Sequence, residues 1–167
     1  ENGLKQFVEP KDSWIAETIT ACTLVAPNDT KVDIQFTHEL GYILNRRIFD
    51  YDLSRIAANE GAEIYTKAYV NGLLFTDDAV SGVKLNYLGE NREIKAKLVI
   101  AADGVDTRVG RWAGLKTNIR MKDMESCVQY SVGNVDIKRN YLTMYVGKNH
   151  APGGYLWIFP KGDKFAN

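Results

Sequence analysis

Hydrophobic and polar residues alternate along much of this chain, which is typical of strands with one exposed face. Partly alternating runs cover 14–25 and 31–36, and the turn-forming sequence APNDT lies between them. Residues 41–45 form a further short strand-like run. The first quarter of the chain is therefore predicted to be β-structure, with one hairpin.

After residue 45 the period becomes helical. Apolar residues recur at the three- and four-residue spacing of one helix face, namely at Ile48, Phe49, Leu53, Ile56 and Ala57. Gly61 follows where a glycine commonly ends a helix. We predict a helix here and a short strand over 62–66.

The middle of the chain predicts a β-meander that ends in a buried strand. Its strands are expected over 68–76, 83–89 and 93–97, with turns at 77–82 and 90–92. Residues 98–102, LVIAA, are continuously apolar, as in a strand buried on both faces of a parallel sheet. A short helix or turn is expected over 106–115, and later strands over 127–132, 141–146 and 155–159.

Composition excludes some function classes. Lysine plus arginine and aspartate plus glutamate number 21 each, so the net charge is zero and no nucleic-acid partner is predicted. No apolar run approaches the roughly 20 residues of a membrane span, and the start of the chain lacks the pattern of a signal peptide. Cys22 and Cys127 are far apart and without a histidine cluster, so we predict two buried thiols in a reducing cytoplasm and no metal site.

The turn after the buried run carries candidate chemistry. Asp103 and Gly104 end the run, and Arg108 and Arg111 follow within a few residues. In open α/β sheets, ligands sit beyond the carboxyl ends of the strands. The carboxylate can accept hydrogen bonds from ribose hydroxyls, and the arginines can pair with a pyrophosphate. A plain turn that Asp103 caps is the alternative, and for the isolated dipeptide it is the commoner arrangement.

The sequence around this turn, VIAADGVDTRVGRWAGL, resembles the Asp-Gly motif of p-hydroxybenzoate-hydroxylase-like flavoproteins. The matching residues are Asp103, Gly104, Thr107 and Arg111. Many hydroxylases of that group have the arginine one position earlier, where this chain has Gly110. The GRWAG form is instead similar to the geranylgeranyl reductase branch.

Two other segments resemble the same branch. The stretch from Gly41 to Ile64 is similar to the family's strand, arginine and R-x-x-F-D-x-x-L helix, with Arg46 at the arginine that lies near the flavin. APGGYLWIFP resembles the P-x-x-Y-x-W-x-F-P segment that lines the substrate cavity, with matches at Pro152, Tyr155, Trp157, Phe159 and Pro160. The alternatives are a solvated helix residue for Arg46 and an ordinary core strand with one aromatic face.

The resemblance implies an α+β fold, in which a β-rich substrate-side sheet joins part of a glutathione-reductase-like, FAD-binding α/β domain. Residues 1–167 would be the central fragment of a flavoprotein. Residues 46–114 would include the part of the FAD-binding domain with the Asp-Gly turn, and 115–167 the substrate-domain strands. The family's G-x-G-x-x-G fingerprint and later Gly-Asp segment do not occur in this sequence, so we expect the piece alone to bind FAD weakly or not at all and to be inactive.

The resemblance further implies that the parent is an FAD-dependent reductase of isoprenoid (geranylgeranyl) double bonds in lipids or diphosphates. Its implied FAD-binding residues are Arg46, Asp103, Gly104, Thr107 and Arg111, and its implied substrate-binding residues are Tyr155, Trp157, Phe159 and Pro160. No catalytic residue is identified. The implied partners are the isoprenoid lipid, reached by peripheral membrane contact, and an electron donor, either ferredoxin or a reduced nicotinamide.

Three alternatives stay open on the sequence. A flavin-dependent monooxygenase or halogenase and an electron-transfer flavoprotein dehydrogenase share the fold, whereas a non-enzymatic β-rich binding module would make the Asp-Gly turn purely structural. The GRWAG form and the aromatic strand favour the reductase. A G-x-G-x-x-G motif after an apolar strand upstream in the parent would support the flavoenzyme, and its absence would support the binding module.

Overall fold

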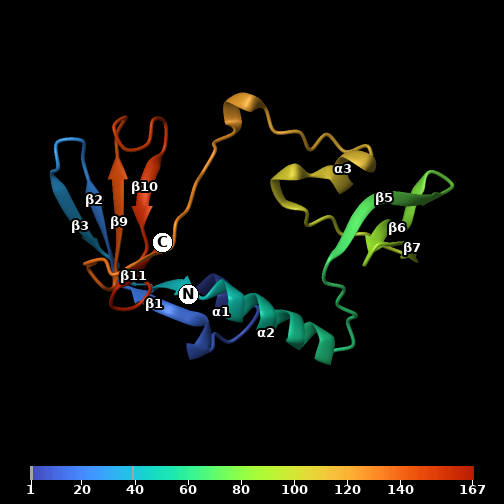
Figure 1. Cartoon of the computed structure of the whole chain (residues 1–167), viewed down its shortest axis with the longest axis horizontal. Helices are drawn as coiled ribbons and strands as arrows, with labels where there is room; N and C mark the ends of the chain where they lie inside the picture. Colours follow the sequence, from blue (N-terminus) through green and yellow to red (C-terminus); the bar gives the residue numbers. More distant parts are fainter. Residues whose placement is uncertain (1, 39) are drawn as a thin grey trace. The chain divides into compact units, whose positions relative to one another are not determined.

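The computed structural model describes residues 2–38 and 40–167 and divides the chain into two compact units. The first unit contains the residues up to Ala62 together with Ser126–Asn167, and the second contains Glu63–Glu125. Helices and strands occur in the chain together (Figure 1), which confirms the predicted α+β class. The predicted functional division near residue 115 stays a prediction.

The first unit is built mainly from short strands and one long helix. Its elements are α1 (Asn2–Lys5), η1 (Asp12–Trp14), β1 (Ile15–Ile19), β2 (Ala21–Val25), β3 (Lys31–Gln35), β4 (Gly41–Leu44), α2 (Arg46–Asn59), β8 (Val132–Gly133), β9 (Tyr141–Val146), β10 (Tyr155–Ile158) and β11 (Phe165–Ala166). Among the described residues, β10, β9, β2 and β3 form a four-stranded sheet in that order. Strands β2 and β9 are parallel and the other neighbours antiparallel.

The run over 14–25 was predicted to be one strand, and the structure divides it at Thr20. The Thr20 N–H donates to the Asn140 carbonyl oxygen at 2.9 Å, outside the regular ladder. On one side of this break β1 pairs with β4, and on the other β2 enters the four-stranded sheet and forms the predicted hairpin with β3. The predicted strands over 41–45, 141–146 and 155–159 are confirmed to within one residue.

The four-stranded sheet has two chemically different faces, because successive side chains of a strand point to opposite sides. The register places Trp157 opposite Met144, and Leu24 lies beside Met144 on the next strand. The side that carries these residues is called the apolar face here; its members are Tyr155, Trp157, Leu142, Met144, Val146, Cys22, Leu24, Val32 and Ile34. The other side, the polar face, carries Thr23, Lys31, Asp33, Tyr141, Thr143 and Tyr145.

Helix α2 confirms the helix predicted from the apolar spacing. It ends at Asn59, and Gly61 follows with a φ of 93° that favours glycine. Its apolar face is only partly covered, since Ile48 and Ile56 are 39% and 38% exposed. In the described part of the chain, no helix combines the length and hydropathy that a membrane crossing requires.

The buried residue Trp14 attaches α2 to the start of β1. Its ring meets Phe49 edge-on, with centroids 5.2 Å apart, and its Nε1–H donates to Asp52 at 2.8 Å. That hydrogen bond, helped by Lys11, holds the pKa of the Asp52 carboxyl below its usual value. The contact fixes the middle of the helix that begins at Arg46.

The second unit is an antiparallel meander followed by a turn region. It contains β5 (Ala68–Thr76), β6 (Ala79–Tyr87), β7 (Glu90–Lys95), η2 (Gly104–Asp106), α3 (Arg108–Trp112) and η3 (Met121–Asp123). The meander is confirmed, but its turns differ from those predicted: the first covers only Asp77-Asp78 and not 77–82, and the second lies at Leu88-Gly89 and not at 90–92. Leu88 and Gly89 have φ values of 53° and 90°, the left-handed pair that a tight hairpin turn requires.

Three strand predictions are wrong. Residues 98–102 are not a buried strand, because β7 ends at Lys95 and Leu98 and Ile100 are 75% and 81% exposed. A central parallel strand depends on hydrogen bonds to neighbours on both sides, and no described residue pairs with this run. Residues 62–66 are irregular, and of 127–132 only the last residue is in a strand. Both segments lie where the chain passes from one unit to the other.

Candidate active site

Three aromatic side chains form a continuous row at the end of β10. The ring centroids of Tyr155 and Trp157 are 6.1 Å apart, and those of Trp157 and Phe159 are also 6.1 Å apart. Tyr155 is 52% exposed, while Trp157 and Phe159 are half-buried. The predicted one-sided aromatic row, called the aromatic row below, is therefore present in the structure.

The aromatic row continues into the apolar face of the sheet. Half-buried Leu142, Met144 and Leu24 lie on the neighbouring strands, and Val32 and Ile34 at the sheet edge are 54% and 45% exposed. This face combines rings, a thioether and branched aliphatic groups with few polar atoms. Chemically, such a surface binds long hydrocarbon chains by burial and does not select for polar groups.

Pro160 does not join the aromatic row. It is fully buried and forms an isolated bridge with Ala166, and it lines the cavity on the polar face together with Ile158. The row and the proline are separated because neighbouring residues of an extended chain point to opposite sides. The three rings are thus brought together as predicted, whereas Pro160 lies behind them.

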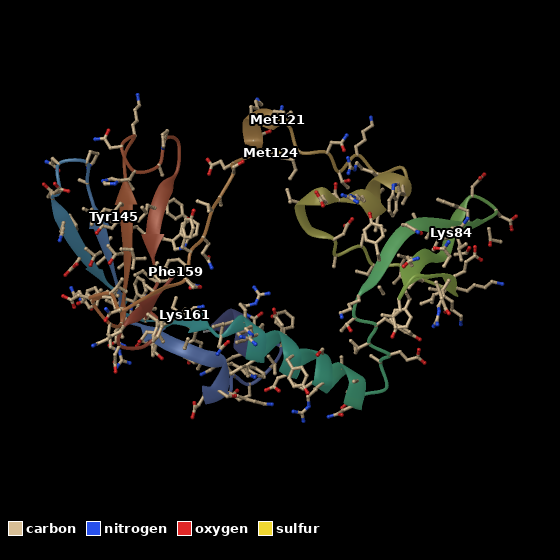
Figure 2. The ribbon with its side chains drawn as sticks, in the orientation of Figure 1. Lys84, Met121, Met124, Tyr145, Phe159 and Lys161 are labelled. Atoms are coloured by element: carbon tan, nitrogen blue, oxygen red, sulfur yellow. The ribbon has the colours of Figure 1, made fainter. Side chains whose placement is uncertain are left out.

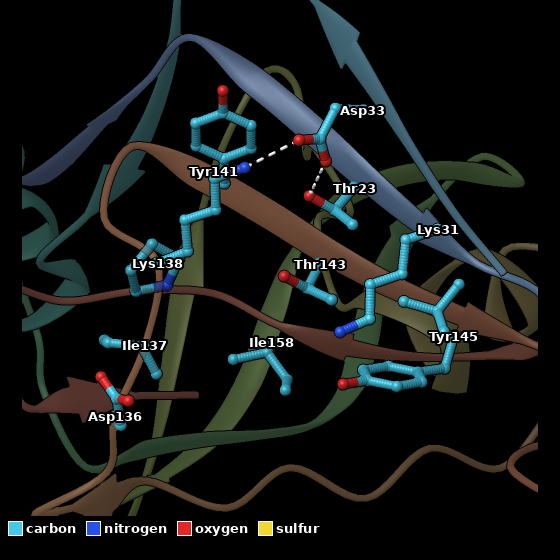
Figure 3. Close-up of a pocket in the computed structure, with 12 residues that line it drawn as sticks. Thr23, Lys31, Asp33, Asp136, Ile137, Lys138, Tyr141, Thr143, Tyr145 and Ile158 are labelled. Carbon is cyan, nitrogen blue, oxygen red and sulfur yellow. Dashed lines mark hydrogen bonds and ion pairs between the residues drawn. The ribbon is translucent and has the colours of Figure 1, made fainter. Parts of the chain in front are cut away.

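The polar face holds a cavity of about 660 Å³ that no sequence motif indicated (Figure 3). Asp33 is its centre: Lys138 Nζ donates to one carboxylate oxygen at 2.8 Å and the Thr23 hydroxyl to the other at 2.5 Å. These two bonds hold the pKa of the Asp33 carboxyl below its usual value, and the pKa of Lys138 is raised by the same ion pair. Lys138 also lies 3.4 Å from the centroid of the Tyr141 ring. Within the cavity lining, Asp33 and Lys138 thus form an ion pair, and Lys31 and Asp136 add one further charge of each sign.

The Asp-Gly turn is exposed. Gly104 has a φ of 68°, and a Cβ built there would meet no atom within 4 Å. Asp103 accepts a hydrogen bond from the Val109 N–H at 2.9 Å through Oδ2. The carboxylate therefore caps α3, which is the structural role considered as the alternative, while its exposed position leaves it accessible to a ligand.

The residues after the turn are largely bound to one another. Thr107 has a φ of 43°, and its hydroxyl is bonded to the Thr117 hydroxyl at 3.0 Å. Arg111 donates to the Asp106 carbonyl oxygen at 2.8 Å, and Arg108 donates to the Tyr69 hydroxyl at 2.6 Å. The two exposed guanidinium groups are held near the turn, whereas the Thr107 hydroxyl is turned inward.

Arg46 lies at the start of α2, with its side chain 72% exposed. Its Nε and Nη2 donate to the two carboxylate oxygens of Asp50 at 2.9 and 3.0 Å, one helical turn later. This pair raises the pKa of Arg46 above its usual value. Arg46 and Asp50 are the arginine and aspartate of the R-x-x-F-D pattern, so the pattern fixes the arginine's orientation.

The cysteines do not form a site. Cys22 is buried in β2, and burial raises the pKa of its thiol; Cys127 is exposed, so the prediction that both thiols are buried is wrong for Cys127. It lies in the segment over 127–132 that does not pair as a strand. In the part of the chain that the structure describes, no three His, Cys, Asp or Glu side chains gather to hold a metal ion.

Comparisons with known proteins agree with this geometry. Residues 123–167, which contain the aromatic row, match the model of the geranylgeranyl reductase catalytic domain. The chain is 42% identical over 168 residues to a digeranylgeranylglycerophospholipid reductase of Methanocella arvoryzae, covering 99% of this chain and 43% of the relative. It is 45% identical over 167 residues to the enzyme of the same name in Methanosarcina acetivorans, covering 98% of this chain and 41% of the relative. The chain belongs to the geranylgeranyl reductase family.

Solved structures share the fold of this chain. A geranylgeranyl bacteriochlorophyll reductase-like protein from Thermoplasma acidophilum superimposes with a TM-score of 0.84 at 32% identity, over 98% of this chain and 42% of that one. The myxobacterial chondrochloren halogenase, an FAD-dependent halogenase, gives a TM-score of 0.65 at 15% identity over 99% of this chain and 38% of that one, which shows the fold alone. The chain spans about two fifths of the length of the curated relatives it matches.

One buried side chain of the first unit was not indicated by the sequence. Glu17 on β1 is buried and bonded to Asn140 just before β9 and to Gly162 just after β10, at one end of the strand pair that carries the aromatic row. Its position depends on a bulge in β1 and on contacts more than 120 residues away in sequence. No local pattern around Glu17 could have indicated it.

Proposed function

We propose that the protein carrying this chain is an FAD-dependent reductase that saturates isoprenoid double bonds, with geranylgeranyl chains of lipids or diphosphates as substrates. The observation that carries this proposal is the aromatic row within a continuous apolar face, located in the segment that matches the family's catalytic domain. The names of the curated relatives support a glycerophospholipid with geranylgeranyl chains.

The apolar face suits an isoprenoid because such a chain offers almost nothing but hydrocarbon. Burial contributes about 0.8 kcal/mol per CH₂ group, so several isoprene units can be held without polar contacts. Tyr155, Trp157 and Phe159 supply the aromatic part of the wall. The hydrogen-bonding groups of the row are the Tyr155 hydroxyl and the Trp157 indole N–H, and we assign no proton donor.

The exposed turn in the second unit offers groups that suit a dinucleotide: Asp103 a carboxylate for ribose hydroxyls, Gly104 room for close backbone approach, and Arg111 a guanidinium group for phosphates. In the first unit, considered by itself, Arg46 offers an exposed guanidinium group of the same kind. Thr107 would act indirectly, by shaping the turn through its bond to Thr117. Reduced FAD would supply the hydride that adds to one alkene carbon, while a proton reaches the other.

We assign residues 46–114 to the region that includes the cofactor-binding turn and 115–167 to the substrate-side strands. A lipid substrate lies in a membrane, so we also propose peripheral membrane contact. The reducing equivalents would come from ferredoxin or a reduced nicotinamide.

The test is an anaerobic assay of the full-length protein with reduced flavin and an unsaturated geranylgeranyl glycerolipid. Mass spectrometry would follow the gain of two hydrogens per saturated double bond. We expect stepwise hydrogenation that depends on both flavin and protein. Oxygen or halogen incorporation under aerobic conditions without any hydrogenation would instead support a monooxygenase or halogenase.

A further inference from the structure

Glu17 is a buried carboxylate in a part of the molecule where an apolar residue could fill the space. The residue is 4% exposed and lies in β1, next to fully buried Ile19 on the same side of the strand. A bulge between Ile15 and Glu17 shifts the pairing with β4, and such a bulge changes the side to which the following side chain points. A buried carboxylate is tolerated only when donors surround it.

Donors from two distant segments surround the Glu17 carboxylate. Oxygen Oε2 accepts from Arg139 Nε at 3.1 Å and from the Gly162 backbone N–H at 3.3 Å. Oxygen Oε1 accepts from Arg139 Nη2 at 3.2 Å and from Asn140 Nδ2 at 3.1 Å. Each oxygen thus has two donors, and together they form a charge-assisted cluster.

These donors sit just before β9 and just after β10, at the end of this antiparallel pair to which Phe159 belongs. Asn140, with a φ of 64°, immediately precedes β9, and its side chain also donates to the Thr18 carbonyl oxygen at 2.8 Å. Gly162 belongs to the turn that follows β10, and Lys161 N–H donates to the Phe165 carbonyl oxygen at 2.7 Å across that turn. Figure 2 labels Phe159 and Lys161, which follow β10 in the chain.

We propose that Glu17 is a positioning residue for the substrate wall. Its carboxylate fixes the start of β9 and the turn at Lys161–Asp163. It thereby holds Trp157 and Phe159 in place beside the β9 side chains of the apolar face. The inference rests on the proposed function, because it assigns the aromatic row to the isoprenoid. It adds a residue that acts on the row indirectly, through the backbone just before β9 and just after β10.

Glu17→Gln in the full-length protein tests this with minimal change in shape. A carboxamide has one accepting end only, so its NH₂ would face two donors whichever way it is turned. We expect the KM for the geranylgeranyl lipid to rise about tenfold while kcat changes less than about threefold and flavin content is retained. Amide hydrogen exchange should speed up at Gly162 and Lys161 and stay unchanged in β5–β7.

Two controls separate positioning from general destabilisation. Ile19→Val removes one methylene from the core beside Glu17 without touching the turn, so it should lower Tm and leave the KM within about twofold. Asp163→Asn affects only the outer Arg139 nitrogen, to which the 79% exposed Asp163 binds at 2.6 Å, and should also leave the KM within about twofold.

The outcomes are distinguishable. An unchanged KM in Glu17→Gln, beside an active wild type, would overturn the inference, and so would exchange at Gly162 and Lys161 that stays at the wild-type rate. If wild type does not hydrogenate the lipid, the proposed function fails, and the exchange measurement still decides whether Glu17 anchors the turn. If Glu17→Gln does not fold, Arg139→Lys decides: it keeps the charge but loses the two-pronged bond, and a wild-type KM and exchange rate there would overturn the inference.

Discussion

The apolar face of the four-stranded sheet and the apolar run before the Asp-Gly turn are similar in composition and differ in structure. In the first, Trp157 and Met144 lie opposite each other in a regular antiparallel pair. In the second, Leu98 and Ile100 are 75% and 81% exposed, and the described residues provide no strand beside them. The difference teaches that the antiparallel β9–β10 pair forms because both strands and their connection lie in this chain. A central parallel strand needs a partner on each side, and the described residues supply none for 98–102.

Substitutions in the apolar face are expected to reduce turnover of the lipid, whereas substitutions at the Asp-Gly turn are expected to weaken FAD binding. Trp157→Ala in the full-length protein should have the largest effect, since removing the middle ring of the aromatic row costs about 3 kcal/mol of burial, or about 100-fold in kcat/KM for the lipid. Flavin content should stay at the wild-type level. Steady-state kinetics under anaerobic conditions would measure both.

The matched control is Leu156→Ala, on the same strand but facing the other side of the sheet. It should reduce kcat/KM by less than about threefold. If Leu156→Ala were as damaging as Trp157→Ala, the assignment of the substrate to one face would be wrong.

Asp103→Ala should act on the other region, by weakening FAD binding about tenfold in the full-length protein. The reason is the loss of the exposed carboxylate proposed to bind a ribose hydroxyl. A purely capping role would cost about 1 kcal/mol of stability and leave flavin occupancy unchanged. Flavin absorbance per protein after gel filtration, with Tm measured in parallel, distinguishes the two.

Gly104→Ala should have a smaller effect, of about 1 kcal/mol on the free energy of unfolding, because alanine is strained at a φ of 68°. No neighbouring atom would obstruct the new methyl group, so strain alone is expected. Chemical denaturation of the full-length protein measures it. A loss of several kcal/mol would show that the turn is packed more tightly than the structure indicates.

The smallest expected effect is the pH-dependent contribution of the Asp33 carboxylate to Tm. The folded pKa of Asp33 lies below its unfolded value, because Lys138 and Thr23 donate to the carboxylate. Its stabilising contribution is therefore fully present above about pH 4, the ordinary aspartate pKa, and is lost as the pH falls through the lowered folded value. Asp33→Asn should thus lower Tm slightly at neutral pH and have less effect in acid; an equal effect at both pH values would contradict the ion pair's role.

Much of this molecule follows from local sequence. The helix at Arg46–Asn59 and the aromatic row were predictable because their side-chain periods appear directly in the sequence. The motif residues Asp103 and Arg46 could be found by resemblance, but their bonds to Val109 and Asp50 needed coordinates.

The features that could not be predicted depend on contacts between residues far apart in the sequence. The break at Thr20 is set by Asn140, and the cluster around Glu17 joins residues more than 120 positions apart. The exposed run at 98–102 has the composition of a core strand, and composition alone does not reveal whether neighbours are present.

The central claim, that the apolar face holds the isoprenoid, is tested most directly by photo-crosslinking. A geranylgeranyl lipid with a diazirine in its chain would be irradiated with the full-length protein, and labelled residues identified by mass spectrometry. The account predicts labels on the apolar-face side chains of β9 and β10, above all Trp157 and Met144. Labels confined to the polar face, at Tyr141, Thr143 or Tyr145, or absent from both strands, would contradict it.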